Sequence, residues 1–547
     1  MKRCVWATGI VFAASGASAQ FSGFESGGFY PTGTSFSPET LEIADLTGDR
    51  RPEFIYTSNA AVGDQLLRWR INDGSGGFGP IASLSFAATG LSTGPGIAAA
   101  DFNNDGNVDV AIANIRGSIF TPSLVVALGN GAGGFTLQTR IDLPGSVDTF
   151  RVYSIAAGEV TGDANTDLVL IDNRGTERGL ITLRGDGAGG FTADRFSAFD
   201  TLFDPDLVRL GDMDSDGDLD AVLNGRDSND RLLVFENDGN ARFITPPKAF
   251  GTGSPNTGYT GNTVSIVDVT ADGLHDLVTS QADVPQQAVI LINDPVNGFT
   301  TAGGLPFTGP AVQLPVLAAD FTLDGVGDVI NTLGVNTITI SYREAIANGV
   351  FEPLVIDAGV VGAGNTGRLN PLRAADLDGN GIRDIIAVTT LRNIAVLLAS
   401  GSAPAPGAFS LVSPADNAAK LPTPDQIAPW GTASAPRLTW EPAQGVSDVT
   451  YRVTIARDAA LTDVVLDQPG ITGTEFTLPT GVIGQGQTFH WAVAATAGGP
   501  STASTPATRT FTTQVSEAEV ADISQDGQVN VFDILVFLGL VDDVDDN

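Results

Sequence analysis

The chain has 547 residues, and 63 Asp and Glu residues against 28 Lys and Arg residues give it a formal net charge of −35. A surface this acidic excludes nucleic-acid binding through phosphates, because such binding needs positive charge. Hydrophobic residues make up 42% of the chain and charged residues 17%, which predicts folded domains rather than a disordered polymer. The 66 glycines and 30 prolines predict many turns and few long helices.

Residues 1–19 have the features of a secretory signal peptide. Lys2 and Arg3 precede a short apolar stretch, and Ala17-Ser18-Ala19 supplies the small residues of a cleavage site. A membrane anchor is the alternative, but the apolar run is too short to cross ~30 Å of hydrocarbon. We therefore expect a secreted or cell-surface protein. The single cysteine, Cys4, lies in this segment, so the mature chain has no thiol chemistry and no disulfide.

An acidic nine-residue motif recurs seven times. The motif occupies residues 45–53, 101–109, 159–167, 212–220, 268–276, 320–328 and 376–384. Such regular spacing indicates repeated supersecondary units. Within each unit, short apolar runs alternate with Gly-rich turns, which is typical of about four strands per unit. The pattern predicts an all-β, seven-bladed β-propeller over residues 20–400, with a right-handed solenoid as the alternative.

The seventh unit lacks its last strand. It ends near Ser400 without the Gly-Gly-Phe segment of the other units, whereas residues 26–31 resemble that segment. We predict that this N-terminal strand completes the seventh sheet. The pairing would close a ring and remove an exposed sheet edge.

The acidic motif itself predicts calcium sites. Positions 1, 3, 5 and 9 can supply oxygen side chains and position 7 a carbonyl, while Gly at position 6 permits a sharp turn. Carboxylates this close need a cation or must protonate, so we expect several structural Ca²⁺ ions, with metal-free acidic turns as the alternative. The first and third loops depart from the pattern, because Arg50 and Ala164 occupy position 6. The candidate ligands are Asp45, Thr47, Asp49 and Glu53; Asp101, Asn103, Asp105 and Asp109; Glu159, Thr161, Asp163 and Asp167; Asp212, Asp214, Asp216 and Asp220; Asp268, Thr270, Asp272 and Asp276; Asp320, Thr322, Asp324 and Asp328; and Asp376, Asp378, Asn380 and Asp384.

These seven motifs in register resemble the FG-GAP/VCBS repeat family, the propeller type found in integrin α-subunit heads. The resemblance covers residues 20–400. It implies a secreted or surface-exposed propeller with calcium in the loops between strands. It implies no particular ligand.

The pattern changes after a Pro/Ala/Gly-rich linker at residues 401–408. Short alternating strands between residues 409 and 514 predict a β-sandwich. The segment resembles a fibronectin type III domain. We expect Trp440 and Trp491 to lie in its core.

Residues 515–547 carry a further candidate metal loop. Oxygen-bearing residues occupy positions 1, 3, 5, 9 and 12 with Gly527 at position 6, which is an EF-hand-type spacing. An apolar segment, residues 534–540, follows and predicts a short helix. The tail resembles half of a type I dockerin, which implies a docking partner; the alternative is a helix that packs on its own protein. The candidate ligands are Asp522, Ser524, Asp526, Asn530 and Asp533.

No catalytic residue stands out. The mature chain has two histidines, His275 and His490, in different predicted domains, so a Ser-His-Asp arrangement is not indicated. We expect a non-enzymatic binding or adhesion protein that uses the propeller to contact an extracellular protein or glycan. The alternatives are a polysaccharide-degrading enzyme such as a propeller lyase or hydrolase, a carbohydrate-binding component of an extracellular complex, and a structural surface component.

Overall fold

The computed structural model divides the chain into two compact units. One contains residues 19–402, and the other contains residues 1–18 with residues 403–547. The structure describes residues 23–34, 38–58, 65–89, 96–113, 123–143, 154–174, 177–198, 204–226, 231–251, 260–281, 287–294, 298–306, 316–333, 339–343, 372–388, 392–401, 405–421, 437–443, 449–479, 482–497 and 501–513. In these ranges, no helix has the length and apolar character needed to cross a membrane.

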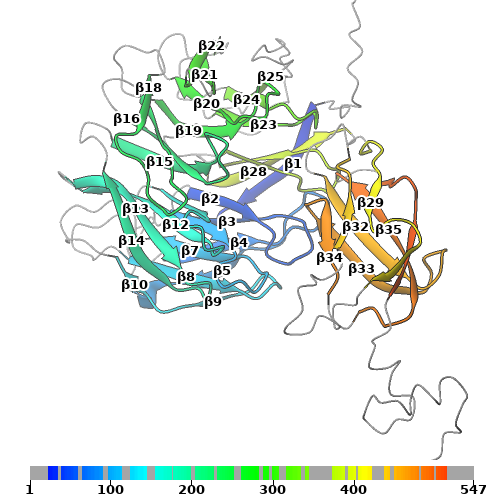
Figure 1. The fold of residues 1–547 in the computed structure, drawn as a ribbon. Helices are drawn as coiled ribbons and strands as arrows, with labels where there is room; N and C mark the ends of the chain where they lie inside the picture. The colour runs from blue at the N-terminus through cyan, green and yellow to red at the C-terminus, as the bar shows by residue number, and fades with distance from the viewer. Residues whose placement is uncertain are drawn as a thin grey trace, which may run out of the picture. The chain divides into compact units, whose positions relative to one another are not determined.

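The first unit consists of small antiparallel sheets that follow one another along the chain (Figure 1). The first sheet contains β2 (Pro38–Ala44), β3 (Glu53–Ser58), β4 (Leu66–Arg70) and β5 (Ala82–Ser85), with a 3-10 turn at Ala87–Thr89. The second contains β6 (Gly96–Ala100), β7 (Asp109–Ala113), β8 (Ser123–Gly129), β9 (Phe135–Leu137) and β10 (Ile141–Asp142), and the third contains β11 (Ile155–Gly158), β12 (Asp167–Arg174), β13 (Glu177–Gly185) and β14 (Phe191–Ala198).

The later sheets of this unit repeat the same order. The fourth contains β15 (Asp204–Gly211), β16 (Asp220–Arg226), β17 (Arg231–Phe235) and β18 (Lys248–Gly251). The fifth contains β19 (Thr260–Val267), β20 (Asp276–Gln281), β21 (Gln287–Ile292) and β22 (Thr300–Pro306). The sixth has β23 (Val316–Ala319), β24 (Asp328–Leu333) and β25 (Thr339–Arg343) among the described residues, and the last joins β26 (Leu372–Ala375), β27 (Asp384–Val388) and β28 (Asn393–Ser400) to β1 (Gly23–Pro31).

The sheets follow a closed order. The first strand of each sheet contacts the first strand of the next, from β2 through β6, β11, β15, β19 and β23 to β26, and β26 also contacts β2. Apolar cores lie between neighbouring sheets, and one of them combines Leu41 and Phe54 with Ile386 and Val396 from the last sheet. Apolar cores cover both faces of the second sheet, so its second strand is a continuous apolar run, and Val110–Ala113 is buried throughout.

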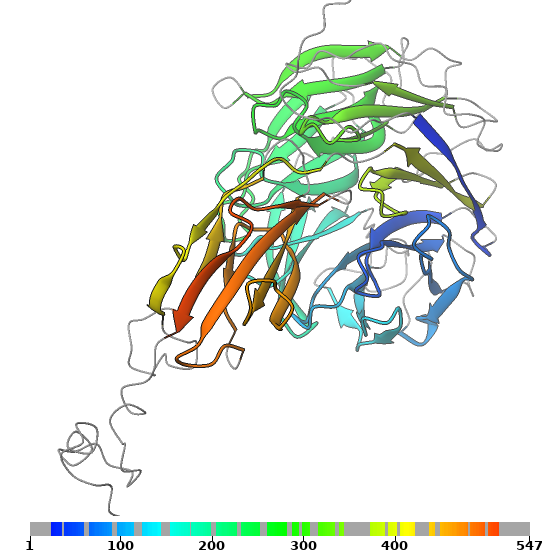
Figure 2. The ribbon, with the colours of Figure 1, turned by 90° about the vertical axis from the view of Figure 1, so that its right-hand side faces the viewer.

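The N-terminal strand completes the last sheet, as the sequence predicts. β1 pairs antiparallel with β28, with Tyr30 opposite Ile394 and Phe29 opposite Ala395. Figures 1 and 2 show the blue first strand beside the yellow-green strands near residue 400. Tyr30 also joins the last sheet to the first, because its ring contacts Phe78 at a centroid distance of 5.3 Å. The two ends of the unit therefore share one sheet.

The second unit contains two sheets over one core. One sheet has the order β29 (Leu411–Ser413), β31 (Arg437–Trp440) and β34 (Glu475–Thr477). The other has the order β30 (Ala418–Leu421), β37 (Arg509–Thr513), β35 (Thr488–Thr496), β32 (Thr450–Ala456) and β33 (Val464–Ile471), with β36 (Thr502–Ala503) beside β35. β30 and β37 are parallel, whereas the other pairs of neighbouring strands in this unit are antiparallel.

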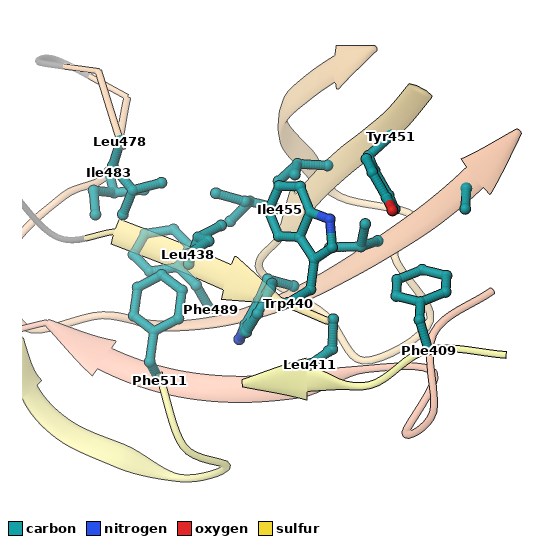
Figure 3. Packing of buried hydrophobic residues seen from close by; sticks show 14 of the residues in the cluster. Phe409, Leu411, Leu438, Trp440, Tyr451, Ile455, Leu478, Ile483, Phe489 and Phe511 are labelled. Atoms are coloured by element: carbon teal, nitrogen blue, oxygen red, sulfur yellow. The ribbon is translucent and has the colours of Figure 1, made fainter. Parts of the chain in front are cut away.

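The core of this unit is aromatic (Figure 3). Trp440 and Trp491 are both buried, which confirms the prediction that they are core residues. The ring of Tyr451 lies 5.4 Å from that of Trp440 and 5.6 Å from that of Phe409, measured between centroids, and Figure 3 shows these three side chains in one cluster. Large rings on the facing sides of two sheets fill the space between them, as in sandwich cores.

Replacing Tyr451 with Phe is expected to destabilise the second unit by about 1–3 kcal/mol. The Tyr451 hydroxyl accepts a hydrogen bond of 2.8 Å from the buried N–H of Ala443, and its loss leaves that donor unsatisfied. Urea unfolding followed by tryptophan fluorescence measures the change. Arg437→Ala is the control, because its ion pair with Glu475 is exposed and worth at most about 1 kcal/mol. Equal stability of wild type and Tyr451→Phe would contradict the assignment.

Candidate metal centre

The seven acidic motifs form one type of loop. Each connects the first strand of a sheet to its second strand. Position 4 has a positive φ in every loop, at Gly48, Asn104, Gly162, Ser215, Ala271, Leu323 and Gly379. Position 6 also has a positive φ throughout, at Arg50, Gly106, Ala164, Gly217, Gly273, Gly325 and Gly381. The first and third loops therefore keep the common backbone despite lacking Gly at position 6.

The carboxylate at position 1 organises each loop through backbone hydrogen bonds. In the second loop, Asp101 Oδ1 accepts from the N–H of Asn103 at 3.3 Å, and Oδ2 accepts from the N–H of Gly106 at 2.8 Å. Asp105, at position 5, accepts from the N–H of Asn107 at 2.8 Å. Such side-chain turns hold the residues between them in the left-handed conformation that most side chains avoid.

The carboxylate at position 9 lies deeper than the others. It is the first residue of the second strand, and it is fully buried in all seven loops. Asp109 accepts from the N–H of Phe102 at 2.9 Å and from the N–H of Gly129 at 2.7 Å, and most of the other loops repeat this pattern. Position 9 thus joins the loop to the end of the third strand, a structural task that the sequence pattern did not reveal.

Burial changes the acidity of these position-9 carboxyls. It raises the pKa of Asp384 to about 8 and the pKa values of Glu53 and Asp220 to about 7, although backbone N–H donors oppose the rise. The charges of neighbouring loop carboxylates add to the increase. Without a cation, full ionisation of the loops is therefore unfavourable at neutral pH.

Two loops bring three carboxylates together among the described residues. Asp212, Asp214 and Asp216 of the fourth loop place one oxygen each within 4.8 Å of one another. Asp376, Asp378 and Asp384 of the last loop do the same. Burial, followed by the charge of Asp216, raises the pKa of Asp214. Positions 1, 3 and 5 therefore meet in one loop, and positions 1, 3 and 9 in the other.

Four of the loops contain a buried side-chain oxygen without a hydrogen-bond partner. Asp212 Oδ1 is buried and has no hydrogen-bond partner. The same is true of the hydroxyl oxygens of Thr47, Thr161 and Thr322, which all occupy position 3. A buried oxygen without a donor is costly, and hard oxygens of this kind are the ligands that Ca²⁺ prefers. The residues present suit a calcium ion, which would neutralise the carboxylates and hold the loop closed.

In the third loop, an arginine side chain supplies positive charge next to a carboxylate. Arg184 Nη1 lies 3.4 Å from Asp163 Oδ2 at position 5, and Arg184 Nε lies 3.4 Å from Asp194. Arg184 begins an Arg-Gly-Asp tripeptide, and Asp186 accepts hydrogen bonds from the N–H groups of Ala188 and Gly190 within its own turn. Both charged side chains of this tripeptide therefore have partners within the protein.

The loops also connect neighbouring sheets. The carbonyl at position 2 accepts from the next sheet, as Gly133 N–H donates to Leu46 at 3.0 Å and Gly189 N–H donates to Phe102 at 2.9 Å. The Asn72 side chain of the first sheet donates to the Leu377 carbonyl of the last sheet at 2.8 Å. An ion that fixes a loop thus also fixes the joint between two sheets. The tail residues Asp522, Ser524, Asp526, Asn530 and Asp533 lie outside the described residues.

In the presence of EDTA, the first unit is expected to become less stable as the pH rises from 5.5 to 8. The folded-state pKa values of Asp220 and Asp384 exceed the ordinary aspartate value, so the native state binds these protons more tightly than the unfolded state. The stabilisation that these two carboxyls give the folded state is complete below about pH 4. It is lost as the pH rises through their raised folded-state pKa values. A pKa difference of one corresponds to about 1.4 kcal/mol.

Thermal unfolding at the two pH values, with EDTA or with calcium, tests this dependence. Calcium should abolish or reverse the trend, because the ion stabilises the ionised carboxylates. Melting temperatures in EDTA that rise between pH 5.5 and pH 8 would show that these buried carboxyls do not control the stability.

Comparison with known proteins identifies the repeats. The family model described as FG-GAP-like repeat matches residues 45–112, 101–170 and 212–279, and each match runs from one acidic loop through the next. No curated protein matches the chain in sequence.

Several solved structures resemble the chain at low identity. A protein from Lactobacillus plantarum has 14% identity and a TM-score of 0.41, over 60% of this chain and 86% of that chain. Bacillus licheniformis rhamnogalacturonan lyase PL11 has 13% identity and a TM-score of 0.42, over 70% and 74% of the two chains. The Dos1 propeller has 10% identity and a TM-score of 0.39, over 68% and 94%. The chain carries FG-GAP-like repeats and is a β-propeller protein.

Proposed function

We propose that the protein is a secreted, calcium-stabilised binding or adhesion protein whose propeller serves as an interaction platform. The observation that carries the metal part of the proposal is the meeting of the Asp212, Asp214 and Asp216 carboxylates, together with the buried Oδ1 of Asp212 that has no hydrogen-bond partner. Because the loops repeat and connect neighbouring sheets, the ions are structural. The binding role rests on the sequence expectation that no catalytic group is assembled outside the loops.

We assign seven blades to the propeller. The support is the sevenfold acidic loop, the closed order of first strands and the pairing of β1 with β28. For the second unit we propose a fibronectin type III-like sandwich, supported by its two sheets with orders β29-β31-β34 and β30-β37-β35-β32-β33. The C-terminal tail remains a proposed docking module on the strength of its sequence alone.

A cleft beside the fourth loop is a suitable contact surface. It has a volume of about 510 Å³, and its walls include Asp214, Glu236, Lys248, Phe250 and Phe299. The rings of Phe250 and Phe299 lie 4.8 Å apart between centroids. Partly exposed aromatic faces next to carboxylates suit a glycan, which presents apolar ring faces and hydroxyl groups.

Binding of the mature protein to a glycan array and to extracts of its own cell surface, in calcium and in EDTA, tests the proposal. We expect retention that depends on calcium and that weakens in Phe250→Ala. Phe29→Ala is the control, because Phe29 is an exposed aromatic residue that lies on β1 and does not line the cleft. Absence of any ligand would contradict the binding role, and release of cleavage products from a bound glycan would favour a polysaccharide-degrading enzyme.

A further inference from the structure

One position recurs on the first strand of all seven sheets, and it holds two arginines, one glutamate and four uncharged residues. These residues stand three positions before each acidic loop, and they are Glu42, Ala98, Ala156, Arg209, Ser265, Leu317 and Arg373. Their strand partners are equivalent too, since Glu42 pairs with Ile55 and Arg373 with Ile386. Because the first strands contact one another in a closed order, the seven positions lie at one level of the ring.

Arg373 and Glu42 form a pair within this level. Arg373 Nη2 lies 3.0 Å from Glu42 Oε1, and the two side chains are 22% and 27% exposed. The pair connects β26 with β2, which are neighbours in the ring. Glu42 therefore compensates one guanidinium.

Arg209 lies on a different side of the ring. Its strand, β15, contacts β11 and β19, whereas Arg373 and Glu42 belong to β26 and β2. Burial and then the charge of Arg373 lower the pKa of Arg209 to about 10, and the charge of Glu42 opposes this change. Arg209 pairs with Val222 in the same register in which Glu42 pairs with Ile55 and Arg373 with Ile386, so the closed order of the first strands places these three residues at one level of the ring.

Arg209 has no carboxylate of its own within the described part of the chain. Its Nη1 donates to the Val208 carbonyl at 3.2 Å, which leaves most of its donors for another acceptor. Two guanidinium groups and one carboxylate thus stand at this level of the ring, and the carboxylate is paired with Arg373, in a chain whose formal net charge is −35. A half-buried charge without a counter-charge is unfavourable, and the planar guanidinium matches carboxylate, sulfate and phosphate oxygens.

We infer that Arg209 and Arg373 form an anion-binding site inside the ring that takes the oxyanion group of a small ligand. Arg209 supplies one guanidinium group. Arg373 supplies the N–H groups that do not bind Glu42, and its ion pair with Glu42 fixes the position of the Arg373 side chain. The ligand is recognised by a carboxylate, sulfate or phosphate group. The site is separate from the acidic loops and needs no metal.

Titration calorimetry of the full-length protein with sulfate, phosphate and acetate, at constant ionic strength in chloride, tests the site. We expect saturable binding of at least one anion, and the tightest of the three identifies the preferred group. Arg209→Leu should weaken it about 10- to 100-fold, the loss expected for a charged hydrogen-bonding partner. Glu42→Gln should strengthen binding, because it removes the competing carboxylate. Arg140→Leu is the control, since Arg140 pairs with Asp142 on another part of the protein.

Thermal unfolding gives a second measurement that does not depend on tight binding. Arg209→Leu should melt at or above the wild-type temperature in chloride, because an uncompensated charge is lost, and should gain less from millimolar sulfate than wild type. If Arg209→Leu does not fold, the effect of Glu42→Gln on affinity decides the question. Equal anion affinity in wild type, Arg209→Leu and Glu42→Gln, or no saturable binding at all, would overturn the site.

Discussion

Deletion of residues 20–36 is expected to make the protein aggregate or to destabilise the first unit severely. The deletion removes β1 and leaves β28 with unpaired N–H and C=O groups along a sheet edge, which favours association with other chains. It also removes the contact of Tyr30 with the first sheet, and with it part of the joint between the two ends of the ring. Light scattering and calorimetry of the truncated protein measure both effects.

A pair of point variants separates ring closure from a general effect of truncation. Tyr30 Oη donates to the Gly27 carbonyl at 3.1 Å and accepts from Phe78 N–H at 3.3 Å, and its ring packs on Phe54 and Phe78. Tyr30→Ala should therefore cost about 2–4 kcal/mol. Its neighbour Phe29 is 40% exposed, so Phe29→Ala should cost less than about 1 kcal/mol. A soluble truncated protein with wild-type stability would contradict the role of β1.

Removal of calcium is expected to lower the melting temperature of the first unit by many degrees. An ion that binds only the folded state stabilises it by about 2.7 kcal/mol per site when its concentration is 100 times the dissociation constant. The two sheets of the second unit provide an internal control in the same calorimetric trace, because their described residues do not form a loop of this kind and the proposed tail loop lies outside them. An unchanged melting curve for the first unit in EDTA would show that the loops hold no stabilising ion.

Asp214→Asn tests one site within the whole set. Burial and then the neighbouring charge of Asp216 raise the pKa of Asp214, so removing its charge should leave stability in EDTA unchanged or slightly higher. Adding calcium should stabilise this variant less than it stabilises the wild type. Asp142→Asn is the control, because Asp142 is exposed and pairs with Arg140 away from the acidic loops. If calcium stabilises the wild type and Asp214→Asn equally, the fourth loop does not bind a stabilising calcium ion.

The sequence allowed the repeat, the position of the loops and the pairing of the N-terminal strand to be predicted, because all three depend on local patterns. The positive φ at position 4 of the loops was not predictable in the same way. Leu323 and Ala271 adopt positive φ there without being glycine, since hydrogen bonds to the position-1 carboxylate hold the backbone. These contacts become visible only when the loop is folded.

The functions of position 9 and of Arg209 depend on tertiary structure. Nothing local distinguishes Asp109 from Asp105, yet one is buried against two backbone N–H groups and the other is exposed. Arg209 and Glu42 are far apart in sequence, and only the closed order of the sheets brings them to one level of the ring. Patterns along the chain indicate what each repeat contains, but not which repeats face one another.

The closure of the ring also determines when folding can finish. Thr32 and Arg392, which are 360 residues apart, are joined by a hydrogen bond of 2.8 Å from the Thr32 hydroxyl to the Arg392 carbonyl. At roughly 5–20 residues per second, a ribosome needs on the order of half a minute to produce the partner of the first strand. Until then, β1 has no partner and the innermost strands cannot complete their circle. The last sheet therefore assembles late, and the rate of that step sets how long a growing chain is exposed to aggregation.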